Sequence, residues 1–334
     1  MRTPPRLSAT VLVAVAAAAA LAACSSASST TAAVSSTSPS ASASASASAT
    51  PTPTMIPTWP VTLTAANGSV TINSLPKRIV SLDPTATEDL YAIGAGTQVV
   101  AVDQDSDYPP GVPTTSLSGL TPNIEAIAKY NPSLVIASQD SNGLVSGLGK
   151  LNIPVLIEPA VSTVADAYLQ IEQIGTATGH GSQATEVVTN MRQEITDAVQ
   201  RVGSTYHGLT YYWELSNDPY YSATSATFIG HILDLFGLKN IADRASKPAD
   251  GGYPELSEEY IVTAKPQLIF LADNESADGG QTPAIVAKRP GWAGIPAVKD
   301  NDIIGLNDDI ASRWGPRLPQ LVDEIANALE GMKS

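Results

Sequence analysis

Cysteine is nearly absent from this chain of 334 residues, because Cys24 is the only one. A single cysteine excludes intramolecular disulfides and metal sites built from several thiolates. The folded part must therefore be stabilised by burial of its core, for which its length is ample. Histidine is also scarce: His180, His207 and His231 are dispersed, with no pair at metal-ligand spacing. We therefore expect no resident metal.

Enzyme motifs are missing as well. The chain contains no Gly-x-Ser-x-Gly elbow and no Walker loop. Gly94 and Gly96 lack the third glycine of a dinucleotide-binding loop and follow a predicted helix, so they indicate a helix end. We expect no enzyme, no catalytic residues and no cofactor of the protein itself. The alternative is an active site assembled from residues far apart in the sequence.

Basic residues are outnumbered, with 18 Lys and Arg against 32 Asp and Glu. Arg2 and Arg6 are the only charged residues before position 61, so the remaining chain has 16 basic and 32 acidic residues and a formal charge near −16. Binding a polyphosphate requires a basic surface, which excludes nucleic acid as a partner. A second apolar run of spanning length is also missing, so the later part is not predicted to cross a membrane.

The N-terminal segment has the features of an export signal. Arg2 and Arg6 precede an apolar run, Val11–Ala20, which is too short to cross a bilayer and leads into Leu-Ala-Ala-Cys. This motif resembles the lipobox of bacterial lipoproteins, whose cysteine is acylated. We predict a lipoprotein signal over residues 1–24 and an anchor at Cys24 on the outer face of the cell membrane. The alternative is an ordinary signal with an incidental cysteine.

Residues 25–60 contain no charged side chain and consist almost entirely of Ser, Ala, Thr and Pro. Such a segment cannot bury enough apolar surface to offset its chain entropy, so we predict a disordered tether. As a flexible coil it would reach about 35 Å from the anchor.

After the predicted tether, strand-like and helix-like segments alternate, which predicts an α/β fold with parallel sheets. Apolar residues from Ser182 to Val202 recur at spacings of three and four, which predicts one long amphipathic helix. We therefore predict two lobes, each with a central parallel sheet, joined by one long bridging helix. The predicted limits are 61–160 for the N-terminal lobe, 161–203 for the helical linker and 204–334 for the C-terminal lobe.

One stretch occurs twice, at residues 123–137 and 257–271. Aligned without a gap, the copies match at Glu125 with Glu259, Ile127 with Ile261, Pro132 with Pro266, and Leu134 with Leu268. Asn123 and Ser257 are N-cap residue types, and the carboxylate two residues later faces the positive end of the helix dipole. Each proline then ends the helix and precedes an apolar strand. The repeat predicts two similar lobes with a cleft between them.

The segment Pro76–Glu88 resembles the opening of the iron-siderophore and cobalamin periplasmic-binding family of ABC importers. The likeness covers residues 61–333 and continues through four further motifs: Asp107–Pro110, Asn123–Glu125, Asn131–Leu134 and Arg289–Trp292. Within that family the chain is most similar to the cobalamin receptors. The resemblance implies a substrate-binding protein of the helical-backbone type, with its ligand in the interlobe cleft.

The family also implies partners. In that family, a glutamate on each lobe docks to arginines of a permease dimer, which works with its ATPase. Carried over by position, the two glutamates are Glu125 and Glu259 in this chain. The alternative is that both residues only stabilise their helices, worth about 0.3–1 kcal/mol each. We expect the protein to act as a monomer.

Ligand positions follow less directly from the resemblance. Tyr221 and Tyr253 fall where cobalamin receptors place aromatic residues, whereas Asp105 and Gly119 stand where that subgroup tends to have Tyr and Trp. Aromatic residues suit a flat or bulky organic ligand. We predict ligand contacts at eight residues: Asp105, Tyr108, Gln139, Tyr220, Tyr221, Tyr253, Arg313 and Trp314.

Ferric siderophores are commonly anionic and captured by arginine clusters, but the expected cleft offers few arginines beside Arg313, namely Arg317 and Arg244. An amide-rich corrinoid or a neutral chelate fits better. We predict an extracytoplasmic binding lipoprotein that delivers a metal chelate, either a corrinoid such as cobalamin or a ferric siderophore, to an ABC permease. The alternatives are a tethered sensor or interaction protein and, less favoured, a surface enzyme.

Overall fold

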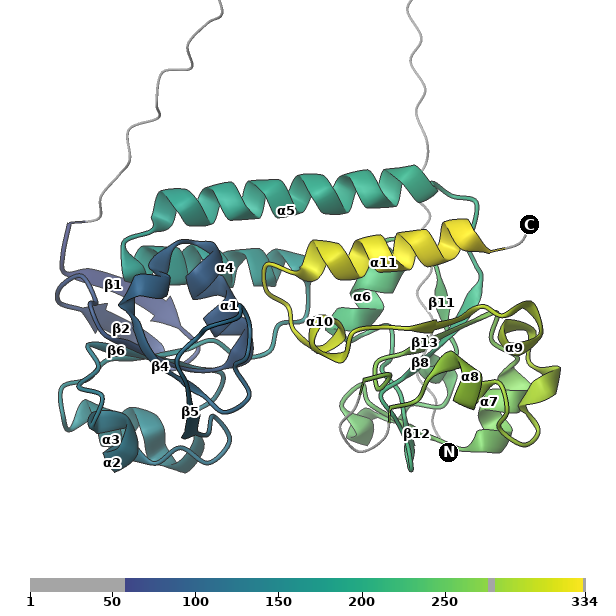
Figure 1. Ribbon diagram of the computed structural model, residues 1–334, viewed down its shortest axis with the longest axis horizontal. Helices are drawn as coiled ribbons and strands as arrows, with labels where there is room; N and C mark the ends of the chain where they lie inside the picture. The colour runs from purple at the N-terminus through teal and green to yellow at the C-terminus, as the bar shows by residue number, and fades with distance from the viewer. Residues whose placement is uncertain (1–57, 276–279, 333–334) are drawn as a thin grey trace, which may run out of the picture. The chain divides into compact units, whose positions relative to one another are not determined.

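The computed structural model of the chain describes residues 58–275 and 280–332 (Figure 1). The predicted signal with Cys24, and the predicted tether up to residue 57, lie outside the described residues. Within the described ranges, no helix has both the length and the apolar composition needed to cross a bilayer.

The first lobe is built around a five-stranded parallel sheet of order β5-β4-β3-β6-β7. The strands are β3 (Ile79–Leu82), β4 (Val99–Asp103), β5 (Thr114–Leu117), β6 (Leu134–Ala137) and β7 (Val155–Ile157). An antiparallel hairpin of β1 (Val61–Ala65) and β2 (Gly68–Ile72) precedes them, and the helices are α1 (Pro84–Ala92), α2 (Ile124–Ala128) and α3 (Leu144–Gly149). Every residue of β3 and β6 is buried, as expected for central strands covered on both faces.

The second lobe contains a four-stranded parallel sheet of order β11-β8-β13-β14. Its strands are β8 (Thr210–Glu214), β11 (Lys239–Asn240), β13 (Leu268–Leu271) and β14 (Ile303–Gly305). Its helices are α6 (Phe228–Asp234), α7 (Glu258–Ala264), α8 (Pro283–Val286), α9 (Pro296–Asp300) and α10 (Asp308–Ser312). A small antiparallel sheet of β9 (Ser216–Asn217), β10 (Tyr220–Tyr221) and β12 (Glu255–Leu256) follows β8. Two-residue strands have no period that a sequence could reveal.

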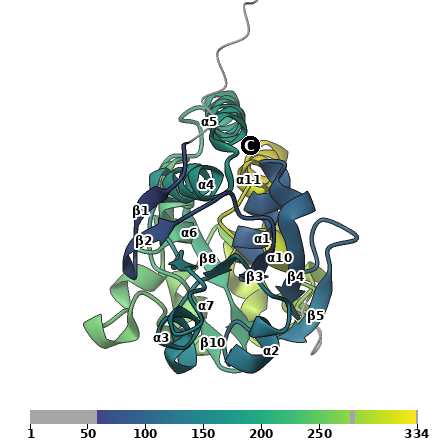
Figure 2. The ribbon, with the colours of Figure 1, turned by 90° about the vertical axis from the view of Figure 1, so that its left-hand side faces the viewer.

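The predicted long helix is confirmed as α5 (Gly181–Val202), which spans the two lobes in Figure 1. It ends where Gly203 adopts a φ of 63°. The bridge holds more than this one helix, because α4 (Val164–Thr178) and α11 (Leu318–Gly331) both pack against α5. Figure 2 shows α5 above the other two. Three packed helices make a stiffer connection than one.

The repeated stretch forms the same unit in both lobes, since α2 leads to β6 and α7 leads to β13. The Asn123 side chain accepts a hydrogen bond from the Ala126 amide at 2.9 Å. The Ser257 hydroxyl accepts one from the Tyr260 amide at 3.1 Å. Both predicted N-caps are therefore confirmed.

Two arginines of the second lobe bind one buried carboxylate of the first. Arg317 contacts Glu88 through two bonds, from Nε to Oε2 at 2.8 Å and from Nη2 to Oε1 at 2.6 Å. Arg313 donates from Nη1 to the same Oε1 at 2.9 Å. The Glu88 side chain is 1% exposed, and the arginine side chains are 10% and 12% exposed. Asp107 and Asp309 also bind Arg313, and we call these five side chains the junction cluster.

Replacing Glu88 by glutamine removes the charge that two nearly buried guanidinium groups share. We expect the free energy of unfolding to fall by about 3–5 kcal/mol, measured by denaturant unfolding. The control is Glu330→Gln, because Glu330 binds the largely exposed Arg201 and its loss should change stability little. Equal losses in the two variants would contradict the structural importance of the junction cluster.

Candidate functional site

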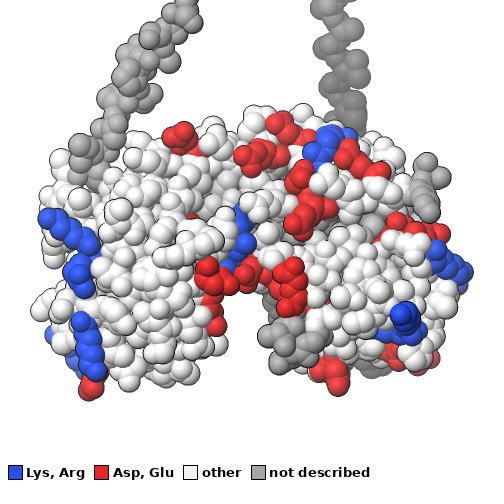
Figure 3. All heavy atoms as spheres, in the orientation of Figure 1, with Lys and Arg blue, Asp and Glu red and all other residues white. Residues whose placement is uncertain are grey.

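Loops from the carboxyl ends of both sheets meet at the lobe junction. Glu88 lies in the helix after β3, Asp107 follows β4, and Arg313 comes after β14 and α10. The face shown in Figure 3 is hollowed between the two lobes, on the side away from α5. Acidic side chains gather along the edge of this hollow. In open α/β sheets, ligands bind in the crevice outside the carboxyl ends of the strands. This hollow is the candidate ligand cleft.

The guanidinium of Arg313 is almost fully occupied by protein oxygens. Its Nη1 donates to Glu88 at 2.9 Å and to Asp107 at 3.0 Å. Its Nη2 donates to Asp309 at 2.7 Å and to the backbone oxygen of Asp105 at 3.2 Å. Four of its five N–H donors are therefore used, which leaves one for any other partner. The ligand contact expected at Arg313 stays a prediction.

Tyr108 and Trp314 also lie at the junction. The Tyr108 ring is 39% exposed and stacks on the Arg317 guanidinium at 4.2 Å. The Trp314 indole donates to the Gln170 side chain at 2.8 Å. A pocket of about 340 Å³ opens beside the junction cluster, lined by Glu88, Tyr91, Ala92, Tyr108, Pro109, Pro316, Arg317 and Gln320. Of the remaining predicted contacts in the first lobe, Asp105 and Gln139 are both exposed.

Three tyrosines of the second lobe are predicted ligand contacts, and we call Tyr220, Tyr221 and Tyr253 the aromatic wall; two of them are exposed and one is partly buried. The Ser222 amide bonds to the Pro254 oxygen at 3.0 Å, which sets Tyr221 and Tyr253 on neighbouring segments. Their side chains are 41% and 49% exposed, so both can touch a ligand. Tyr220 instead packs against Trp292, with ring centroids 5.9 Å apart.

Gly119 differs from the tryptophan that the family resemblance would place there. A Cβ at this position would lie 2.2 Å from the Leu82 backbone oxygen, at the end of β3. No larger side chain fits unless the backbone moves. The next residue, Leu120, is 70% exposed and supplies an apolar side chain in the same loop. Sequence reasoning missed Leu120, because β5, the strand before this loop, was itself not predicted.

Carboxyl groups are buried where strands of both sheets end. Burial raises the pKa of Asp83, which follows β3, to about 6. Burial, with a smaller effect of the Asp83 charge, raises the pKa of Glu158 after β7 to about 8. Burial and the Glu214 charge raise the pKa of Asp273 after β13 to about 7. Glu158 is therefore mostly protonated at neutral pH, and sequence reasoning gave none of these residues a role.

The two predicted docking carboxylates, Glu125 and Glu259, are exposed in the first turns of α2 and α7. Figure 1 shows both helices in the lower half of their lobes, away from α5. The two helices thus lie on the same side of the molecule. The docking role of the glutamates stays a prediction.

The start of α7 is held by the motif Arg289–Trp292. The Trp292 indole, which is fully buried, donates to Glu258 Oε1 at 3.0 Å. Arg289 lies 4.6 Å from the Trp292 ring and binds Glu214 through two bonds of 2.6 Å. The motif therefore positions the helix that carries Glu259.

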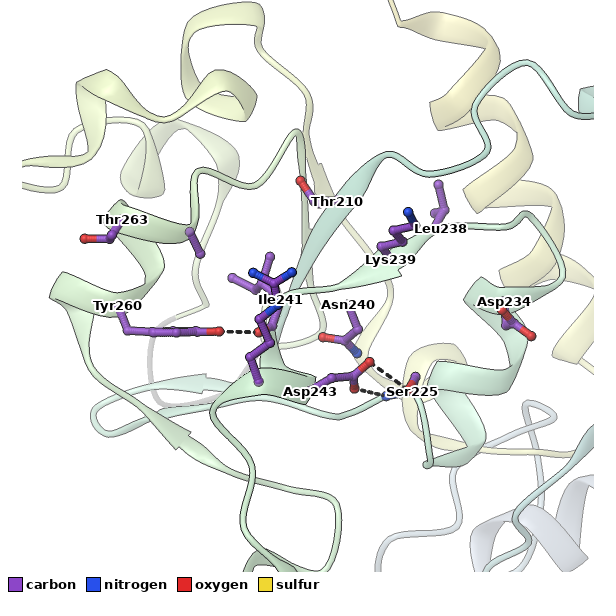
Figure 4. A pocket seen from close by; sticks show the side chains of 12 residues that line it. Thr210, Ser225, Asp234, Leu238, Lys239, Asn240, Ile241, Asp243, Tyr260 and Thr263 are labelled. Atoms are coloured by element: carbon purple, nitrogen blue, oxygen red, sulfur yellow. Dashed lines mark hydrogen bonds between the residues drawn. The ribbon is translucent and has the colours of Figure 1, made fainter. Parts of the chain in front are cut away.

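A second pocket of about 610 Å³ lies at the free edge of β11, between α6 and α7 (Figure 4). Lys239 and Asn240 contribute side chains from the strand. The backbone amide and the hydroxyl of Ser225 both donate to the Asp243 carboxylate at 2.8 Å. Arg244, considered above for the cleft, lines this pocket. It shares no lining residue with the pocket at the junction cluster.

Among the described residues, no group of three or more His, Cys, Asp and Glu side chains could hold a metal ion. His180 lies between α4 and α5, and its Nδ1 lies 3.0 Å from the Thr178 oxygen.

Comparison with known proteins gives a consistent result. Residues 79–310 match the periplasmic binding protein family. YvrC of Bacillus subtilis, an ABC transporter substrate-binding lipoprotein, is 31% identical over 280 residues, which cover 81% of this chain and 86% of YvrC. A vitamin B12-binding protein of Pectobacterium carotovorum is 30% identical over 267 residues, covering 78% of this chain and 90% of that protein.

Among solved structures, the periplasmic heme-binding protein RhuT of Roseiflexus in its apo form superposes with a TM-score of 0.65 at 25% identity. The match covers 76% of this chain and 97% of RhuT. The family predicted from the sequence motifs is confirmed, as are the two lobes with parallel sheets and a helical bridge. The chain therefore belongs to the periplasmic binding protein family and is a substrate-binding protein of an ABC transporter.

Proposed function

We propose that this protein captures a metal chelate in the cleft between its lobes and delivers it to the permease dimer of an ABC importer. The metal would enter only as part of the chelate. The observation that carries this proposal is the meeting of carboxyl-end loops from both sheets at one hollow. Tyr221 of β10 and Tyr253, just before β12, add two exposed rings to the second lobe. Such exposed rings suit a corrinoid or the organic shell of a ferric siderophore.

The relatives support this choice of cargo class. One is named as a vitamin B12-binding protein and another as a heme-binding protein, and both ligands are metal complexes of large organic rings. The relative named as a lipoprotein supports acylation of Cys24. On this proposal the protein acts as a monomer outside the cell, attached to the membrane only by lipid.

Binding is tested by titrating the full chain with cobalamin and a panel of ferric siderophores. Trp314 is the expected fluorescence reporter, because it lies at the junction, whereas Trp213 and Trp292 are fully buried and Trp59 lies before β1. The double variant Tyr221→Ala, Tyr253→Ala should raise the Kd of the bound chelate about tenfold, or about 1.4 kcal/mol.

Leu151→Ala is the matched control for that titration, since Leu151 is similarly exposed (51%) but lies after α3. Its Kd should equal that of the unaltered protein. If no chelate changes Trp314 fluorescence or the melting temperature, the metal-chelate function is wrong.

Docking is tested by the double variant Glu125→Ala, Glu259→Ala. Uptake of the chelate should be lost in cells that carry this variant in place of the native chain, because paired charges set the register of an interface. Chelate affinity should be unchanged, and each helix should lose only about 0.3–1 kcal/mol of dipole stabilisation.

The double variant Glu186→Ala, Glu194→Ala removes the same charge from exposed positions of α5 and should leave uptake normal. Normal uptake by the Glu125 and Glu259 double variant would exclude docking through these residues and would favour the sensor alternative.

Anchoring is tested by Cys24→Ser. The variant should appear in the soluble fraction and should no longer incorporate a labelled fatty acid, since the serine cannot carry the thioether-linked lipid. Retention of the variant in the membrane fraction would refute lipid attachment at this residue.

A further inference from the structure

We propose that Asp107 and Asp309 make the cleft select chelates by charge, so that neutral and cationic metal chelates bind and anionic chelates are rejected. This inference rests on the proposed function, and it names which class of chelate that function would serve. Both aspartates belong to the junction cluster, where they bind the Arg313 guanidinium.

An anionic ligand would need arginine donors that are free to bind it. Recognition of a carboxylate or catecholate by arginine depends on two parallel N–H groups of one guanidinium. Arg313 has only its Nε–H left after binding four protein oxygens. Arg317 uses two of its five N–H donors on the Glu88 carboxylate, which offsets its positive charge, and the Tyr108 ring covers one side of its plane. Arg289 is likewise bound by two oxygens of Glu214.

The lobe junction carries a net negative charge. The junction cluster contains three carboxylates and two guanidinium groups, which leaves one negative charge. The exposed Asp105 lies two residues before Asp107, and its carboxylate enters no ion pair within the described ranges. With Asp105 included, the local charge is near minus two. Figure 3 agrees, since acidic side chains border the hollow and other basic side chains of this face lie away from it.

Asp107 and Asp309 are suited to control this charge. Their side chains are 64% and 39% exposed, so both face solvent and can act on an approaching ligand. Replacing them by asparagine keeps their shape, and Arg313 keeps its partner Glu88, so no buried charge is left unpaired. The change would weaken the bonds that these two positions accept from Arg313, because an amide oxygen is a poorer acceptor than a carboxylate, and would raise the local charge from near minus two to near zero.

The experiment compares ferric chelates that differ in charge. The full chain is titrated with a cationic ferric trihydroxamate, a neutral ferric trihydroxamate and an anionic ferric tricatecholate, together with neutral cyanocobalamin. At low salt, the tightest neutral or cationic probe should bind at least about tenfold more tightly than the anionic probe. We call this ratio of Kd values the gap, and added salt should narrow it because salt screens exposed charges.

Two double variants then test the residues. Asp107→Asn, Asp309→Asn should strengthen binding of the anionic probe by about tenfold and narrow the gap. The control, Asp323→Asn, Glu330→Gln, removes the same total charge from the exposed Arg201 pairs and should leave the gap unchanged.

The outcomes separate two failures. Equal affinity for the anionic and neutral probes, or an equal effect of both double variants, overturns charge selection while leaving chelate binding intact. If none of the probes binds, the proposed function fails and the charge rule fails with it.

Discussion

The contact between the two lobes depends on one buried carboxylate that two arginines share. Removing Glu88 from water is unfavourable unless its charge is paired, and Arg313 and Arg317 supply that pairing from the other lobe. The lobes cannot separate at this point unless three charge-assisted hydrogen bonds break. The helices α4, α5 and α11 connect the lobes at a second place. Two independent connections restrict the cleft to small changes in width.

Local physical rules explain why most elements could be predicted from the sequence. Asn123 and Ser257 cap their helices through side-chain bonds to nearby amides, so these helix starts need no information from elsewhere in the chain. The period of α5 and the apolar run of β4 are equally local signals. β5 and the small sheet of β9, β10 and β12 were missed, because short or polar strands are defined by their partners rather than by their own residues.

The candidate site was less predictable, because its decisive contacts join distant residues. Arg313 and Glu88 lie 225 positions apart, and no local pattern indicates that they meet. Arg313 lies at the lobe junction, and its pairing there decides whether the guanidinium is available to a ligand. Gly119 is a second example of a residue whose identity depends on a distant contact, since only the nearby Leu82 oxygen explains why it has no side chain. The sequence predicts which loops lie near the site, but only the folded structure shows which of their side chains are paired with each other.

The aromatic wall and the predicted docking helix are joined by a short series of packed residues. Tyr221 is followed inward by Tyr220, whose ring packs on Trp292, and Trp292 binds Glu258 at the start of α7. Trp292 is fully buried, and Arg289 fixes the same cluster through two bonds to a buried carboxylate. Coupling between sites requires an element with two arrangements, and close packing of this kind favours one. The support of α7 should therefore hold Glu259 in the same place whether or not a chelate contacts Tyr221, and the lobes would present one docking surface for different cargoes.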